Sequence, residues 1–180
     1  MFVSLPPSIR AACAILVSTV TVSASASAQS ARRFEATAGA FAGQSNFGFY
    51  VRDWHKMLGL RTTQSFSIIE LEESLVHVFG CGDQGCTWDP ATYVTVGLHL
   101  SVPVTTSFRP YAGGSIGGSS RPGIASFTRS WDIGARYVFN NQFGVQADIR
   151  RRRETVFDEP RNPFNASTEI SLGFIKRFQF

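Results

Sequence analysis

The chain has 180 residues, a formal net charge of +4 and 43% apolar residues. This length suits one domain and leaves no room for a separate catalytic module. A charge this small does not require a nucleic-acid partner.

The N-terminal segment has the layout of a cleaved signal peptide. Arg10 is followed by an apolar run over residues 11–22, and the segment ends with Ala-Ser-Ala at positions 26–28. A positive charge, an apolar run and small residues in this order predict cleavage directly after that string. The expected organisation is a signal peptide, residues 1–28, and one folded domain, residues 29–180.

Neither a membrane helix nor a lipid anchor is expected. The apolar run is shorter than the roughly 20 residues that a spanning helix needs, and Cys13 lies at its start instead of just after it. Downstream, apolar residues are dispersed, as expected where lipid-facing side chains alternate with polar ones along strands. A soluble β-sandwich has the same composition, so this feature alone leaves both folds open.

The N-terminal half of the mature chain predicts strands over residues 34–43, 64–71 and 74–80. Residues 49–60 fit either an extension of a strand or a short helix in the first loop. The sequence from Ser67 to Glu73 breaks the alternation of apolar and polar residues. The bounds of the second and third strands are therefore the least defined.

Cys81 and Cys86 are the two cysteines of the mature chain. In an exported protein such a pair predicts a disulfide. A metal site would need further thiols or histidines at suitable spacing, and His55, His77 and His99 are far apart in the sequence. Neither a metal nor another cofactor is predicted.

Two hairpins and a final strand are predicted in the second half. The first hairpin joins residues 92–104 to 108–117, and the second joins 130–139 to 143–150. The final strand, residues 169–180, has Ile170, Leu172, Phe174, Phe178 and Phe180 on one face, with Lys176 as the exception. Period-two alternation of this kind is typical of a strand with one apolar face.

The connections differ in length. Turns near residues 105 and 141 are short, whereas segments 80–91, 118–129 and 153–167 are longer and rich in Gly, Pro, Asn, Asp and Ser. Short periplasmic turns and longer external loops are typical of outer-membrane barrels. With both ends of the mature chain in the periplasm the strand number is even. We therefore expect an all-β, up-and-down antiparallel transmembrane barrel of eight strands.

The end of the chain, Gly173 to Phe180, alternates apolar residues and stops at an aromatic one. It resembles the ending of the eight-stranded OmpA/OmpX-like outer-membrane barrels. In that family the last strand is similar to an address recognised by the barrel-assembly machinery, which implies this role for Phe174, Phe178 and Phe180. The resemblance also implies a location in the cell outer membrane, and we expect a monomer.

Charged residues on the polar faces are candidates for an ion-pair network. Eight strands enclose an interior just wide enough to be filled by side chains, and buried charges need partners. A proton or ion path is the alternative use of the same groups. The candidates are Glu35, Arg109, Asp132, Arg136, Asp148, Glu169 and Arg177.

Two further groups of residues are candidates for a catalytic site and for a phosphate-binding site. His99 and Ser101 are similar to the His-x-Ser of outer-membrane lipid A deacylases, but they fall on the lumen face near the periplasmic end, and no Glu is assignable as their partner. No catalytic residue is therefore predicted. Residues 150–153 form an arginine run at the external end of a strand, where Arg151, Arg153 and Arg161 are candidate contacts for lipopolysaccharide phosphates. The alternative is a solvated strand end with alternate arginines facing inward.

The predicted function is a non-enzymatic outer-membrane protein whose loops meet lipopolysaccharide, surfaces or host ligands. A narrow channel for small solutes and a lipid A-modifying esterase are the alternatives. Fold-level resemblance supports the architecture and does not identify one activity.

Overall fold

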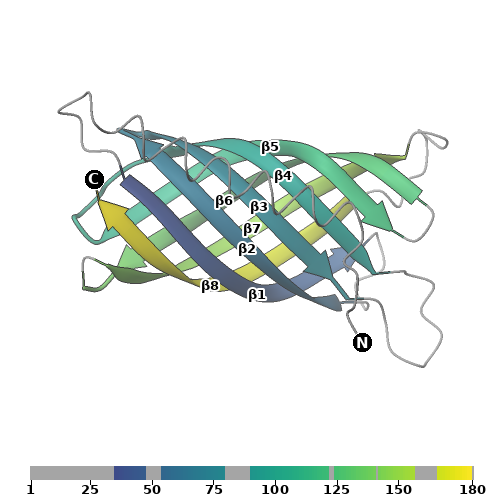
Figure 1. Ribbon diagram of the computed structural model, residues 1–180, viewed down its shortest axis with the longest axis horizontal. Helices are drawn as coiled ribbons and strands as arrows, with labels where there is room; N and C mark the ends of the chain where they lie inside the picture. Colours follow the sequence, from purple (N-terminus) through teal and green to yellow (C-terminus); the bar gives the residue numbers. More distant parts are fainter. Residues whose placement is uncertain are drawn as a thin grey trace, which may run out of the picture.

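The computed structural model describes residues 35–47, 54–79, 90–121, 124–140, 142–156 and 166–179. Its strands are β1 (Glu35–Phe47), β2 (Trp54–Phe66), β3 (Ile69–Val78), β4 (Ala91–Ser101), β5 (Phe108–Arg121), β6 (Ile124–Val138), β7 (Phe143–Val156) and β8 (Ala166–Gln179). Each strand pairs antiparallel with the next, and β8 pairs with β1, which closes the barrel (Figure 1). The predicted eight-stranded up-and-down barrel is confirmed.

The two faces of the barrel wall have opposite character, because successive side chains of a strand point to opposite sides. On β4, Val96, Leu98 and Leu100 are 43%, 62% and 60% exposed on the outer face, whereas Gly97 and His99 between them are buried. The same alternation runs along the other strands, with an exception on β3, where Glu73 is buried on the outer face. Large apolar side chains therefore form most of the outside, and polar side chains fill most of the interior. The interior also holds one buried apolar cluster, made of Phe41, Met57, Val76, Val78, Ala91 and Tyr93.

The two ends of the barrel are built differently. At one end, the turn end, β1 begins and β8 ends side by side, and three pairs of strands are joined by residues 67–68, 102–107 and 139–142. Asn140 orders the last of these turns, because its Oδ1 accepts hydrogen bonds from the backbone N–H groups of Gln142 and Phe143, at 3.2 and 2.7 Å. The opposite end, the loop end, is where β1, β3, β5 and β7 finish.

The second and third strands differ from the prediction. Residues 64–71 were expected to form one strand, but the hairpin turn falls inside them, at Ser67 and Ile68. Ser67 has a φ of 64°, as two-residue hairpin turns require, although Asn and Gly are the usual residues there. The stretch left open at residues 49–60 is strand from Trp54 onward. This turn explains the broken alternation at residues 67–69, whereas the adjacent Glu72 and Glu73 both lie within β3.

The connection predicted at residues 118–129 is wrong. β5 continues to Arg121 and β6 starts at Ile124, and these two residues face each other in the register. Glycine and serine content suggested a loop there, but small side chains fit the pleated inner wall as well. β4 is also shorter than predicted, since it ends at Ser101, and the chain bends at residues 104–107.

Candidate functional site: the charged interior of the barrel

The interior of the barrel carries balanced charge. Within the described ranges, seven arginines and seven carboxylates point inward, and each takes part in at least one ion pair. They are Arg61, Arg109, Arg121, Arg136, Arg150, Arg152 and Arg177, with Glu35, Glu70, Glu72, Asp132, Asp148, Glu154 and Glu169. Burial of a charge is tolerated when a partner of opposite sign lies beside it.

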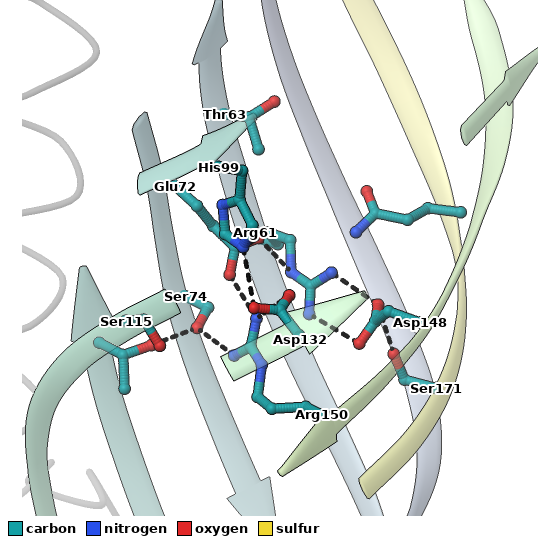
Figure 2. Close-up of polar contacts among 12 residues, drawn as sticks. Arg61, Thr63, Glu72, Ser74, His99, Ser115, Asp132, Asp148, Arg150 and Ser171 are labelled. Atoms are coloured by element: carbon teal, nitrogen blue, oxygen red, sulfur yellow. Dashed lines mark hydrogen bonds and ion pairs between the residues drawn. The ribbon is translucent and has the colours of Figure 1, made fainter. Parts of the chain in front are cut away.

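The middle of the interior is occupied by a four-strand cluster (Figure 2). Arg150 on β7 donates from Nη2 to Glu72 on β3 at 2.5 Å and to Asp132 on β6 at 3.2 Å. His99 on β4 lies with Nε2 2.9 Å from the other oxygen of Asp132 and 3.8 Å from Glu72. All four side chains are buried. The guanidinium of Arg150 therefore links β3 to β6, which are three strands apart in the barrel.

Arg61 connects this cluster to the opposite wall. Its Nη1 donates to Asp148 Oδ2 at 2.7 Å, and its Nε lies 3.4 Å from Glu72 Oε2. Ser171 on β8 donates to the same oxygen of Asp148 at 2.9 Å. Figure 2 shows Arg61 between Glu72 and Asp148. Arg61 and Arg150 together tie β2, β3, β6, β7 and β8 to one network.

The network continues to both ends. Toward the turn end, Arg136 pairs with Glu70 at 2.5 Å, and Glu35 accepts from Arg177 at 2.6 Å and lies 3.2 Å from Arg109. Toward the loop end, Arg152 donates through Nε and Nη2 to both oxygens of Glu169, at 2.7 and 3.0 Å. Beyond that pair, Arg121 and the hydroxyl of Tyr93 donate to Glu154.

The seven residues proposed for the interior network all lie inside the barrel and in ion pairs. Half of the inward charges were not among the predicted residues, namely Arg61, Glu70, Glu72, Arg121, Arg150, Arg152 and Glu154. Glu70 and Glu72 were missed because the β2–β3 turn was misplaced, and Glu154 because residues 153–167 were expected to form a connection. Arg150 and Arg152 had been grouped with an external run, although their parity along β7 marks them as inward.

Glu72, His99 and Asp132 have ligand atoms within 4.8 Å of one another, a spacing that would suit a metal ion. Arg150 already bonds both carboxylates, at 2.5 and 3.2 Å. The positive charge that a metal would bring to these oxygens is thus supplied by a guanidinium. The arrangement is that of an ion-pair cluster.

His99 and Ser101 lack the hydrogen bond of a serine–histidine pair. The acidic partner that the sequence could not assign is present, since Asp132 and Glu72 lie beside His99. However, His99 Nδ1 and Ser101 Oγ are both buried without a hydrogen-bond partner among the described atoms, so no Ser–His hydrogen bond exists. His99 is only 1% exposed. A lipid outside the barrel has no access to it.

The arginine run divides by parity. Arg150 and Arg152 are buried inside, whereas Arg151 and Arg153 lie on the outer face near the loop end. Arg151 donates to Thr168 at 2.5 Å. Both alternatives considered for this run thus describe part of it. The third lipopolysaccharide candidate, Arg161, lies outside the described residues.

Other predicted residues fall partly outside the described chain. Cys81 and Cys86 lie outside it, so their disulfide stays a prediction. Phe180 also lies outside it. Phe174 and Phe178 lie on the outer face of β8 and are 73% and 38% exposed. Their position fits the apolar face predicted for the last strand.

Comparison with known proteins identifies the fold. No family model matches the sequence, and no curated protein shows recognisable sequence similarity. Neisserial surface protein A superposes with a TM-score of 0.61 and 12% identity, over 81% of this chain and 97% of its own. The attachment invasion locus protein of Yersinia pestis gives 0.51 and 13%, over 81% and 98%. A de novo designed transmembrane β-barrel gives 0.52 and 10%, over 79% and 95%.

In the part of the chain that the structure describes, no helix is long and apolar enough to cross a membrane. The two natural neighbours are eight-stranded outer-membrane barrels, and they match nearly their whole length. The resemblance to the OmpA/OmpX-like barrels is thereby confirmed at the level of the fold. The chain has the architecture of an eight-stranded outer-membrane β-barrel.

Proposed function

We propose that the chain is a monomeric integral protein of the outer membrane that serves as a sealed anchor for its external loops. The loops would meet lipopolysaccharide, other surfaces or host ligands, and the barrel would hold them at the membrane. The role that we propose is non-enzymatic. It follows from the chemistry of the two faces of the wall.

The outer face supports the membrane location. Large apolar side chains are exposed around the barrel, among them Leu98 at 62%, Trp131 at 57% and Leu172 at 63%. A contiguous apolar surface of this kind is rare on a monomer in water and marks contact with another apolar phase. An apolar band with aromatic residues near its edges is typical of outer-membrane barrels. The predicted signal peptide supplies the route of export.

The packing of the interior supports the second part of the proposal, that the barrel has no pore. Ion pairs cross the interior from Glu35 at the turn end to Glu154 at the loop end. A solute would have to separate pairs such as Arg150 and Glu72, and breaking a buried pair is strongly unfavourable. This continuous series of pairs is the observation that best separates an anchor from the channel alternative.

Reconstitution into lipid tests both the membrane location and the absence of a pore. Barrel refolded in phospholipid vesicles should migrate differently on electrophoresis with and without boiling, which reports a folded membrane barrel. The same preparation should show no conductance steps in planar bilayers. A soluble product without a mobility shift would remove the membrane location. Regular conductance steps from heat-modifiable protein would replace the anchor by a channel.

The assembly role of the last strand is part of the proposal. Phe174 and Phe178 face outward at the end of β8, and Phe180 follows them. Replacing Phe180 by Ser should reduce the amount of heat-modifiable protein in outer membranes. Refolding of the same variant from urea into vesicles should stay close to normal, because only the first route uses the assembly machinery.

A further inference from the structure

The outer face of the barrel carries an arginine triad, Arg129, Arg151 and Arg153, on neighbouring strands near the loop end. Arg129 on β6 lies directly opposite Arg153 on β7 in the register. Arg151 is two positions along β7 on the same face, opposite Trp131. Opposite positions in an antiparallel pair place Cβ atoms about 5 Å apart, and diagonal positions about 7–8 Å apart. Three positive charges therefore share one small area.

Among the described residues, no arginine of this triad has the carboxylate partner that every inward arginine has. Arg129 and Arg153 are exposed, and neither forms an ion pair or hydrogen bond with any side chain in the described ranges. Like charges directly opposite each other destabilise a sheet. On the inner face of the same strands, Arg150 and Arg152 each hold a carboxylate. The outer arrangement is therefore one that an external anion would stabilise.

The position of the triad selects the kind of anion. Immediately toward the middle of the barrel lie Trp131, Ile133 and Ile149, which are 57%, 52% and 46% exposed. An anion bound by the triad thus sits at the edge of the apolar band, where lipid headgroups begin. Arg151 is held in place by Thr168 at 2.5 Å, so part of the site is ordered before any ligand arrives.

The distribution of positive charges on the outer face also favours an anion site near the loop end. On the described outer face, four cations lie near the loop end, namely Lys56, Arg129, Arg151 and Arg153, and one, Lys176, lies near the turn end. Only the three arginines gather on adjacent strands. Arginine binds phosphate through two parallel N–H donors and is better suited than lysine to this geometry.

We infer that Arg129, Arg151 and Arg153 form a binding site for the phosphate group of a lipid in the leaflet at the loop end, with Trp131 and Ile149 against its acyl chains. The inference rests on the proposed membrane location and adds a ligand class and a residue, Arg129, to it. The chemistry is that of a phosphorylated lipid such as lipid A. Charge on the lipid and apolar contact below it are both required.

Titration of the refolded full barrel with lipid A tests the site. Native mass spectrometry in a neutral detergent would give dissociation constants for diphosphoryl lipid A and for the same lipid without phosphates. Arg129→Gln and Arg153→Gln are each expected to weaken binding of the phosphorylated lipid by about three- to tenfold. Lys56→Gln is the matched control, because Lys56 lies near the same end on β2, four strands from β6 and three from β7, and should leave binding unchanged.

The outcomes separate the site from general attraction and from the proposed function. Equal weakening by Lys56→Gln, or equal affinity for the dephosphorylated lipid, would overturn the site. Displacement of the lipid by an equimolar amount of inorganic phosphate would also overturn it, because the acyl contacts would then contribute nothing. Heat-dependent mobility is measured for every variant. Loss of that mobility in the unaltered protein would overturn the membrane barrel itself, whereas intact mobility without lipid selectivity would overturn only this site.

Discussion

The inner and outer walls of this barrel are made by the same strands and follow opposite rules. On β7, Arg150 and Arg152 are buried beside carboxylates, while Ile149 one residue away is 46% exposed. In a water-soluble protein the apolar side would be the buried one. The comparison shows that each wall is matched to what it faces, a packed ionic interior on one side and an apolar phase on the other.

The largest effect is expected from an unpaired charge on the inner wall. Arg150→Met leaves Glu72 and Asp132 without the guanidinium that bonds both, and should lower the free energy of unfolding by about 3–5 kcal/mol. Arg153→Met on the outer wall of the same strand should change it by less than about 0.5 kcal/mol. Urea titration of both variants in vesicles measures the difference. Similar losses in the two variants would contradict the distinction between the walls.

A charge placed on the outer wall should be costly only at depth. Leu172, at the middle of β8, is 63% exposed, and Leu172→Arg should destabilise the barrel in vesicles by about 2–4 kcal/mol. Thr155→Arg, near the loop end of β7, should cost about 0–1 kcal/mol. Folding free energies in phosphatidylcholine vesicles provide the test. If depth made no difference, the apolar band would not be in contact with hydrocarbon.

Neighbouring glycines distinguish the walls by space. A Cβ on inward Gly117 would lie 2.0 Å from the carbonyl oxygen of Val94, whereas a Cβ on outward Gly118 meets nothing closer than 3.7 Å. Gly117→Ala should therefore cost about 1–3 kcal/mol through overpacking, and Gly118→Ala less than about 0.5 kcal/mol. Midpoints of urea unfolding would show this. Equal midpoints would mean that the inner wall can relax around an added methyl group.

The smallest effect concerns the one lysine at the turn end of the outer wall. The Lys176 ammonium lies 5.4 Å from the centre of the Phe178 ring and 5.9 Å from that of Phe143. Lys176→Met keeps the aliphatic contact and removes the cation–π attraction, so a loss of about 0.5–1 kcal/mol is expected. Lys56→Met, without a ring partner among the described residues, serves as the comparison in the same unfolding assay. Stabilisation by Lys176→Met would show that desolvation of the ammonium outweighs the ring contacts.

Alternation allowed the middle parts of β4 through β8 to be predicted from the sequence, because one face of each strand is mostly apolar there; the loop ends of β5 and β6 were missed. Val94 to Leu100 and Ile170 to Phe174 are examples. The β2–β3 hairpin was missed for a physical reason. Its turn has Ser67 with a positive φ, at a position where glycine or asparagine would have indicated a hairpin in the sequence. In addition, Glu73 interrupts the apolar face of β3, where it accepts a hydrogen bond from Thr62 at 3.2 Å.

The candidate site was predictable as a type and not as a set of pairs. Parity along the strands identified inward residues such as Asp132 and Asp148, and the size of the barrel implied that they are paired. Which arginine meets which carboxylate depends on contacts across the interior, such as Arg61 with Asp148, 87 positions apart. Strand alternation carries no information on such contacts. The arginine triad needed the β6–β7 register, since Arg129 and Arg153 are far apart in the chain.

Closure of the barrel has a consequence for the life of the unfinished chain. β1 and β8 pair along their whole length, and the ion pair from Glu35 to Arg177 joins residues 142 positions apart. Until β8 is available, the growing sheet has two open edges that can pair with other chains. Contacts this distant also form slowly. The unfinished chain must therefore be kept from aggregating until β8 is available, and a chain lacking β8 would leave a sheet with two open edges in place of a barrel.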